Sequence, residues 1–324
     1  MKVSVIIPIY NVARFIERCA VSLMEQTLSG VEYIFVNDAT PDDSMQLLRA
    51  VLERYPAKAA QVKIVEHAQN KGLPAARNTG LAVAKGEYVF HCDSDDYVEP
   101  TILEELYNAV KGCDADFVWC DWYLSYDNSE RYMKQPSFNT SLEALKAMLG
   151  GAMKYNVWNK LVRRSLYVDN GIEFPAGYGM GEDMTMIRLV ACAGKVAYVN
   201  KALYHYVRSN SEAMTQAYSE CHLRDVSYNV NETMEFLASK GLDTEKEMAF
   251  FKLNVKLPFL VTGNWDSYRM WSKWYPEANA YIGANVNMPW RTRFLQQMAA
   301  KRFYVGVWIY YQVIYRFLYT ILYK

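Results

Sequence analysis

Short apolar segments alternate with amphipathic ones in the N-terminal part of the chain. Four segments are short, continuously apolar and rich in β-branched or aromatic side chains, which is typical of strands covered on both faces of a parallel sheet: residues 3–9, 31–36, 62–65 and 88–92. The segments between them carry apolar side chains at helical spacing: residues 11–23, 41–52 and 75–84. This alternation predicts an α/β fold with an open, mostly parallel sheet flanked by helices.

The alternation loosens beyond residue 115. We expect helices at 141–149 and after a glycine-rich loop at 177–181, a loop or hairpin at 121–135, and strands at 115–120, 157–162, 196–199 and 202–207. From about residue 219 helical periodicity takes over. The sequence therefore predicts two domains, an α/β domain at residues 1–217 and a helical C-terminal region at residues 218–324.

Polar side chains follow each of the four N-terminal strands. They stand directly behind the apolar segments, in chain order: Tyr10 and Asn11, Asp38, Asn70, and Asp93 with Asp95. The carboxyl ends of parallel strands meet at one edge of a sheet, and ligands bind in the crevice outside that edge. The sequence therefore predicts a ligand-binding site built from these residues.

The acidic turn after the fourth strand suggests a cation site. Asp93 and Asp95 can offer oxygens to one small hard cation, which would keep some waters and take further ligands from a diphosphate. An EF-hand loop would need an oxygen ligand at Tyr97 and a glycine at Val98, so that interpretation fails. The alternative is an ordinary turn that caps a helix announced by Pro100.

Composition and motifs exclude several classes of protein. The formal net charge is zero, which argues against a nucleic-acid partner. The six cysteines show no C-x-x-C pairing and indicate reduced thiols of a cytosolic protein, not a zinc site or a disulfide framework. No G-x-G-x-x-G follows the first strand and no Walker lysine loop is present, so dinucleotide and P-loop sites have no support.

The C-terminal tail is basic and aromatic. After Glu277 the chain has no acidic residue, and its basic residues there are Arg291, Arg293, Lys301, Arg302, Arg316 and Lys324. Residues 303–323 are long enough to span a bilayer, but Gln312, Arg316 and many tyrosines make them too polar. We expect a helix on an anionic membrane surface, with the protein peripheral at the inner face of the cytoplasmic membrane. The alternatives are docking on the core or a homodimer interface.

Four motifs occur in a characteristic order: Pro8-Ile9-Tyr10-Asn11, Val36-Asn37-Asp38, Asn70-Lys71-Gly72-Leu73-Pro74-Ala75-Ala76-Arg77-Asn78-Thr79-Gly80, and Asp93-Ser94-Asp95-Asp96. Together they resemble the inverting family 2 glycosyltransferases with a GT-A fold, over roughly residues 3–215. The loop after Asp38 departs from the family, since it has Ala-Thr-Pro-Asp at residues 39–42 in place of a Gly-Ser-Thr-Asp run. The carboxylate positions are kept.

The resemblance implies a nucleotide-diphosphate-sugar donor, usually a UDP-sugar, and a Mn²⁺ or Mg²⁺ ion. Asp95 would be the main metal ligand, and Asp93 would reach the metal or the ribose of the nucleotide-sugar. The other residues would bind the nucleotide-sugar: Pro8, Tyr10, Asn11, Asp38, Asn70, Arg77, Lys160 and Arg208. For Lys160 and Arg208 there are alternatives to a phosphate contact: Lys160 could be a solvated neighbour of a buried Trp158, and Arg208 a surface arginine at a strand end.

The acidic pair Glu182 and Asp183 matches the family's catalytic pair. Inverting transfer needs a carboxylate base that takes the proton of the acceptor hydroxyl, and we expect Asp183 in this role with Glu182 supporting it. Acidic residues at the start of a helix also stabilise the helix dipole without any catalytic duty. Which of the two is the base stays open, and so does the role of Asp96, which could cap a helix or contact the sugar.

These observations favour an enzyme that transfers a sugar to a carbohydrate or lipid-linked acceptor in surface polysaccharide biosynthesis. The second hypothesis is a non-catalytic, membrane-associated scaffold that has kept the fold. The intact set Asp38, Asp93, Asp95 and Asp183 argues against it. A nucleotidylyltransferase would need a glycine-rich signature after the first strand, which is missing.

Overall fold

The computed structural model describes residues 1–179, 181–208 and 220–318, and the chain forms two compact units. One unit comprises residues 1–144 and 155–236, and the other comprises residues 145–154 and 237–324. The change from the first unit to the second falls inside helix α8 (Glu220–Ser239), whereas the domain boundary expected from the sequence precedes this helix.

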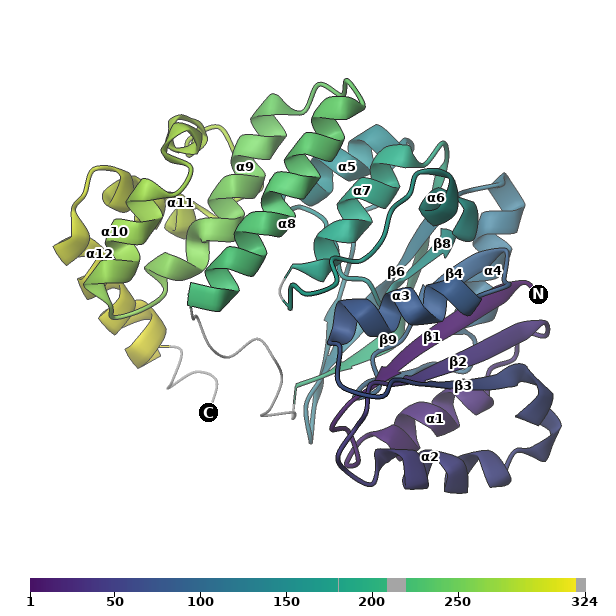
Figure 1. Ribbon diagram of the computed structural model, residues 1–324. Coiled ribbons are helices and arrows are strands. Elements are labelled where there is room, and N and C mark those ends of the chain that lie inside the picture. Colours follow the sequence, from purple (N-terminus) through teal and green to yellow (C-terminus); the bar gives the residue numbers. More distant parts are fainter. Residues whose placement is uncertain (180, 209–219, 319–324) are drawn as a thin grey trace. The chain divides into compact units, whose positions relative to one another are not determined.

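The first unit is built on a mixed sheet whose N-terminal half is parallel (Figure 1). Its strands pair in the order β3-β2-β1-β4: β1 (Val3–Ile9), β2 (Val31–Asn37), β3 (Val62–Glu66) and β4 (Tyr88–His91). The connections contain α1 (Ile16–Met24), α2 (Ser44–Glu53) with the short 3₁₀ helix η1 (Pro56–Gln61), and α3 (Leu73–Val83). The predicted α/β fold is confirmed.

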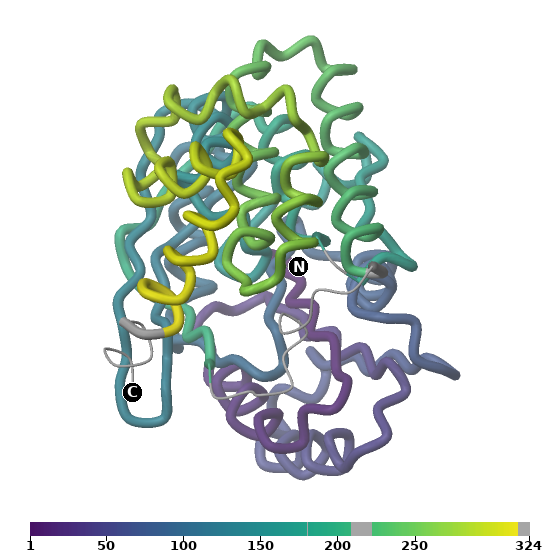
Figure 2. Tube along the Cα trace, turned by 90° about the vertical axis from the view of Figure 1, so that its left-hand side faces the viewer, coloured from purple at the N-terminus to yellow at the C-terminus, as the bar shows by residue number. Residues whose placement is uncertain are grey.

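The other half of the sheet is mainly antiparallel. It contains β5 (Tyr97–Val98), β6 (Phe117–Ser125), β7 (Glu130–Met133), β8 (Lys160–Arg163) and β9 (Val196–Val207). Strand β8 runs antiparallel between β4 and β6, while β9 pairs parallel with β6 and antiparallel with β5. The stretch at 121–135 is a hairpin of β6 and β7, which projects as a narrow loop at the lower left of Figure 2.

Strand β9 corrects one prediction from the sequence. Residues 196–199 and 202–207 form one strand and not two. Its register against β6 shifts where Cys120 pairs with Val199 but Asp121 pairs with Ala202. Two polar residues, Asn200 and Lys201, are thus accommodated as a bulge, and they interrupt the apolar pattern without ending the strand.

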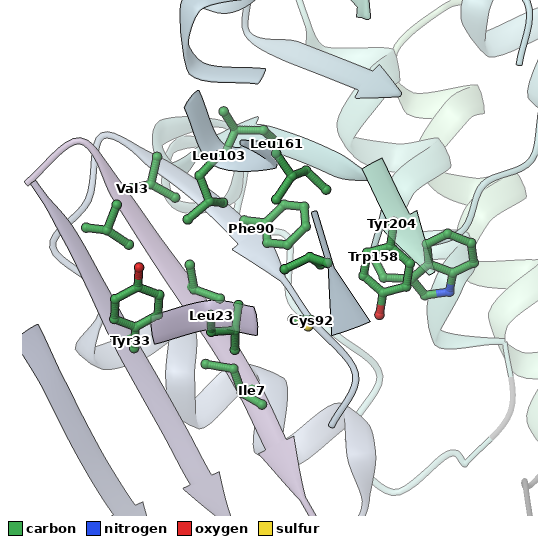
Figure 3. Packing of buried hydrophobic residues seen from close by; sticks show 14 of the residues in the cluster. Val3, Ile7, Leu23, Tyr33, Phe90, Cys92, Leu103, Trp158, Leu161 and Tyr204 are labelled. Carbon is green, nitrogen blue, oxygen red and sulfur yellow. The ribbon is translucent and has the colours of Figure 1, made fainter. Parts of the chain in front are cut away.

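Helices cover both faces of β1. Its residues Val3 and Ile7 belong to a buried cluster with Leu23 of α1 and Leu103 of α4 (Ile102–Cys113), shown in Figure 3. Ile6 points to the other face, where α3 packs so closely that a Cβ on Gly80 would lie 2.4 Å from the Ile6 side chain. Helix α3 is therefore held tightly against β1.

The remaining elements of the first unit follow β7 and precede β9 along the chain. They are the start of α5 (Ser141–Gly150), α6 (Arg164–Asp169), the 3₁₀ turn η2 (Glu182–Met184) and α7 (Thr185–Cys192). The predicted strand at 157–162 is shorter than expected, because regular pairing of β8 begins at Lys160.

The second unit is helical. Its elements are α9 (Glu245–Lys256), η4 (Leu257–Leu260), α10 (Trp265–Lys273), η5 (Pro276–Tyr281), α11 (Trp290–Ala300), α12 (Tyr304–Tyr310) and the π-helical segment η6 (Tyr311–Leu318). Lys256 is buried in this unit and donates to the Trp274 carbonyl and Asn279 Oδ1, at 3.0 and 2.7 Å. Among the described residues, no helix combines the length and apolar character needed to cross a bilayer.

Candidate active site

The acidic turn behind β4 presents two of its three carboxylates to the outside. Ser94 and Asp96 are buried, whereas Asp93 and Asp95 are half-buried. The Asp96 amide donates to the Asp93 carbonyl at 3.1 Å and closes the turn. Asp93 and Asp95 thus stand at the carboxyl end of the sheet, where the sequence places them.

Arg77 of α3 lies beside this turn and is only 1% exposed. Its Nη2 donates to Asp93 Oδ1 at 2.8 Å. Burial alone would lower the pKa of this guanidinium, but the charges of Asp93, Glu182 and Asp183 raise it above its usual value. Its Nε and Nη1 are buried without a hydrogen-bond partner among the described residues. Buried, unpaired donors of a cation are costly, so Arg77 is a candidate residue for binding an anion.

The acidic pair stands on η2, behind a glycine-rich loop. Gly181 has φ +90°, which favours glycine, and a Cβ there would lie 3.2 Å from Asn229 Cβ. The Val157 amide donates to Asp183 Oδ1 at 3.1 Å. Glu182 and Asp183 both interact electrostatically with Arg77, so the structure brings them to the same guanidinium as Asp93.

The two carboxyl groups of this pair differ in electrostatic environment. Burial and then the Asp183 charge raise the pKa of Glu182 to about 8. Burial also raises the pKa of Asp183, to about 6, while the cations Arg77 and Lys160 oppose the rise. Burial therefore makes both carboxyl groups hold a proton more readily than usual, and the two titrate as an interacting pair.

Helix α8 holds the glycine-rich loop in place. The Gly179 amide donates to Asp225 Oδ2 at 2.9 Å, and the rings of Tyr178 and Tyr228 stack with centroids 3.7 Å apart. Reasoning from the sequence missed Asp225 and Tyr228, because they lie in a region recognised only by its helical periodicity. No local motif connects them to residues far earlier in the chain.

Asp96 has a structural environment that the sequence did not reveal. It is 1% exposed, and its carboxylate accepts from Tyr204 Oη and from the Val207 amide, both at 2.7 Å. Tyr204 Oη also accepts from the Asp93 amide at 3.1 Å. Asp96 therefore ties the acidic turn to β9, and it does not cap α4, whose N-cap residue is Thr101.

An aromatic stack continues this connection. The ring of Tyr204 stacks on that of Trp158, with centroids 4.4 Å apart and planes 20° from parallel (Figure 3). Trp158 directly follows Val157, whose amide holds Asp183. The stack thus links the acidic turn behind β4 to the backbone that positions Asp183.

Asp38 organises the loop before α3. It is buried, and its carboxylate accepts from the Lys71 and Gly72 amides, both at 2.8 Å. His67 Nδ1 lies 2.6 Å from Asp38 Oδ1, a partner that the sequence pattern did not single out. Asp38 thus shapes the loop that contains Asn70, and its role in binding the nucleotide-sugar stays a prediction.

The other residues that are predicted to bind the nucleotide-sugar lie at the same edge of the sheet. Pro8 is buried in β1 opposite Val36, and Tyr10 directly behind β1 is 47% exposed. Asn11 adopts φ +57°, and its amide donates to Thr40 Oγ1 at 2.8 Å. Asn70 is exposed. The structure therefore leaves Tyr10, Asn11 and Asn70 accessible at the edge where the sequence predicts a ligand.

Lys160 and Arg208 occupy different surroundings. Lys160 is 1% exposed, and its Nζ donates to the Asn156 carbonyl and to Asn159 Oδ1, at 2.6 and 2.7 Å. Burial lowers its pKa to about 7. Arg208 is exposed at the end of β9, and its amide donates to the Ser125 carbonyl at 2.9 Å. Residues 209–211, which directly follow Arg208, lie outside the described residues.

The residues of the acidic turn fit a divalent cation that is shared with a ligand. In the part of the chain that the structure describes, no group of three or more His, Cys, Asp or Glu side chains could hold a metal ion. Asp93 and Asp95 instead offer two half-buried carboxylates. Mg²⁺ and similar ions are commonly bound in this way, through one or two carboxylates, waters and substrate phosphates.

Comparison with known proteins identifies the family. The family model described as Glycosyl transferase family 2 matches residues 4–179. The chain belongs to this family, and it is therefore a glycosyltransferase. The predicted family is thus confirmed.

Two relatives and one solved structure illustrate the similarity. "Uncharacterized glycosyltransferase EpsJ" of Bacillus subtilis is 32% identical over 66% of this chain, which covers 63% of EpsJ. "Glycosyltransferase GlyG" of Streptococcus pneumoniae is 30% identical over 74% of this chain and 82% of GlyG. The crystal structure of residues 1–349 of S. aureus TarS in complex with UDP-GlcNAc has a TM-score of 0.72 at 22% identity, and covers 96% of this chain and 92% of TarS 1–349.

Proposed function

We propose that this glycosyltransferase moves a sugar, with inversion, from a nucleotide diphosphate to a hydroxyl of a carbohydrate or lipid-linked acceptor. The observation that carries the proposal is Arg77, a buried guanidinium with unpaired donors that is surrounded by the carboxylates of Asp93, Glu182 and Asp183. It joins an anion site to a candidate base within one cluster. The UDP-GlcNAc complex of the similar TarS structure supports a UDP-sugar as donor.

Asp95 and Asp93 would hold a Mn²⁺ or Mg²⁺ ion. When bound, such an ion neutralises negative charge that develops on the departing diphosphate. Arg77 keeps Asp93 oriented through one oxygen and leaves the second oxygen of that carboxylate for another ligand. The unpaired Nε and Nη1 of Arg77 would bind the anionic part of the donor.

Asp183 would act as the general base. Its carboxylate takes the proton of the acceptor hydroxyl as that oxygen bonds to the anomeric carbon and the bond from this carbon to the diphosphate oxygen breaks. Burial raises the pKa of Asp183 to about 6, close enough to neutrality for a useful base that is still mostly ionised. Glu182, whose pKa is raised further, would support it in the protonated form.

Thermal denaturation tests donor and metal binding. We expect UDP with Mn²⁺ to stabilise the protein, by about 2.7 kcal/mol at a hundredfold excess over Kd, and Asp95→Ala to abolish the effect. Asp127→Ala, at an exposed aspartate on the β6–β7 hairpin, is the matched control and should keep it. NMR of the product would then establish the anomeric configuration. The scaffold hypothesis would be favoured if no nucleotide diphosphate stabilised the protein and if no sugar were transferred from a panel of sugar nucleotides.

The proposed place of the reaction is the cytoplasm, at the inner face of the membrane, where a lipid-linked acceptor of a surface polysaccharide is available. The basic, aromatic-rich segment after Glu277 supports this location, because anionic lipids attract such segments.

A further inference from the structure

Helices α11 and α12 of the second unit expose an unusual number of large apolar side chains. Trp290 and Phe294 of α11 are 66% and 49% exposed. On α12 and the segments around it, five further side chains are at least 38% exposed: Phe303, Val305, Trp308, Ile309 and Val313. Single exposed apolar residues need no explanation, but a contiguous group marks an interaction surface.

We call these seven side chains the apolar face, and three of them meet in one groove. Trp290 and Phe294 are four residues apart, so they lie on one side of α11, opposite the buried Leu295 and Ala299. Phe294, Ile309 and Val313 line a common groove of about 270 Å³ between α11, α12 and η6, whose lining is apolar. The contact of these two helices is seen at the yellow end of the trace in Figure 2.

The apolar face is bordered by cations without anions. Arg291, Lys301 and Arg302 are exposed, and Arg293 is half-buried on α11. Ion pairs in this unit join Lys252 to Glu277 and Arg269 to Asp266, and the chain has no acidic residue after Glu277. Among the described residues, none of these four cations forms an ion pair.

We propose that the apolar face is the surface by which this protein docks on an anionic phospholipid bilayer. Tryptophan, phenylalanine and tyrosine favour the boundary between head groups and acyl chains, and arginine and lysine beside them favour anionic lipids. Five of its seven side chains lie in the tail expected from the sequence, and Trp290 and Phe294 of α11 extend the surface beyond that tail. This docking rests on the membrane location given under the proposed function and names the surface responsible for it, but it does not depend on the proposed reaction.

A second copy of the chain fits this face less well. Most homodimers place the same patch of both subunits against each other across a twofold axis. Such an arrangement would bring the cations around one apolar face near those around the other. No acidic residue follows Glu277 to compensate them. A bilayer containing anionic lipids supplies the opposite charge and the apolar phase together.

Vesicle co-sedimentation of the full chain, without nucleotide or metal, tests the proposal. We expect binding to vesicles of phosphatidylglycerol mixed with phosphatidylcholine and little binding to phosphatidylcholine alone. The double variant Arg291→Ala/Arg302→Ala should bind about 25-fold more weakly, at roughly fivefold per cation. In the double variant Trp290→Ser/Phe294→Ser, the affinity for the same vesicles should fall about tenfold or more.

Two control variants change similar exposed residues in the first unit. Val168→Ser removes a valine that is 61% exposed, and Lys63→Ala removes an exposed lysine of β3, so both should bind as the wild type does. Circular dichroism verifies that every variant is folded. Donor turnover measured without vesicles should be unchanged in all four variants, which separates a failure of docking from a failure of the proposed reaction.

Three results would overturn the proposal. The first is a wild-type protein that does not sediment with anionic vesicles. The second is an equal loss of vesicle binding in the two apolar-face variants and in the two control variants. The third is a dimer, seen by light scattering, that Trp290→Ser/Phe294→Ser dissociates while vesicle binding is absent, which would make the face a contact between two copies of the chain.

Discussion

The two groups of carboxylates in the first unit differ in what holds them in place. Asp93 and Asp95 stand on a turn directly behind a strand, so the register of the sheet decides where they lie. Glu182 and Asp183 stand on a short 3₁₀ turn, held by the Val157 amide and by the contact of Gly179 with Asp225. Strand β4 thus places the proposed donor side, which contacts with Arg77 and Tyr204 also hold. Contacts between distant segments place the proposed acceptor side, and burial raises its pKa values.

The largest expected effect comes from the acceptor side. Asp183→Asn removes the proposed base with almost no change in volume, so kcat should fall by about 10²–10⁴-fold. Binding of UDP with Mn²⁺ should remain, because the donor side is held independently by the sheet. Steady-state kinetics and calorimetric titration measure the two quantities.

Glu182→Gln is the matched comparison for that variant. Glutamine resembles the protonated acid that the raised pKa of Glu182 favours, so kcat should change less than tenfold. A large loss in Glu182→Gln with near-normal activity in Asp183→Asn would assign the base to Glu182 instead.

The next effect is on the pH dependence of the reaction. The base must be ionised, so kcat/KM should fall about tenfold per pH unit below the pKa of Asp183, near 6, and level off above it. The Lys160 charge lowers this pKa. Lys160→Met should therefore move the acid limb to higher pH, as a profile of kcat/KM against pH would show.

Lys256→Met provides a control with the same substitution at a second buried lysine. Burial lowers the pKa of Lys256 to about 8, but this residue belongs to the second unit and to a different set of hydrogen bonds. The acid limb should stay where it is in this variant. An equal displacement in both variants would show that the shift does not come from a charge near Asp183.

The comparison of the two carboxylate groups also explains what the sequence could predict. Strand ends and motifs located Asp38, Asp93 and Asp95, because their positions follow from periodicity over a few residues. The sequence also named Arg77, but not its unpaired donors, since burial is a property of the packed fold. The contacts of Asp225, Tyr228 and Tyr204 escaped prediction because they join segments far apart in the chain, and the bulge at Asn200 was taken for a strand break.

The smallest expected effect tests whether the donor side is as independent as its strand suggests. Tyr204→Phe removes the hydroxyl that donates to buried Asp96 and accepts from the Asp93 amide. The free energy of unfolding should fall by about 1–3 kcal/mol, because the Asp96 carboxylate loses a partner that water cannot replace. KM for the donor should rise severalfold while the acid limb of kcat/KM stays in place. Tyr206→Phe, which also alters a ring stacked on Trp158, is the control and should affect the donor KM less. If Tyr204→Phe leaves the donor KM unchanged, the hydrogen bonds of the Tyr204 hydroxyl do not position the acidic turn, and strand β4 alone holds the proposed donor side.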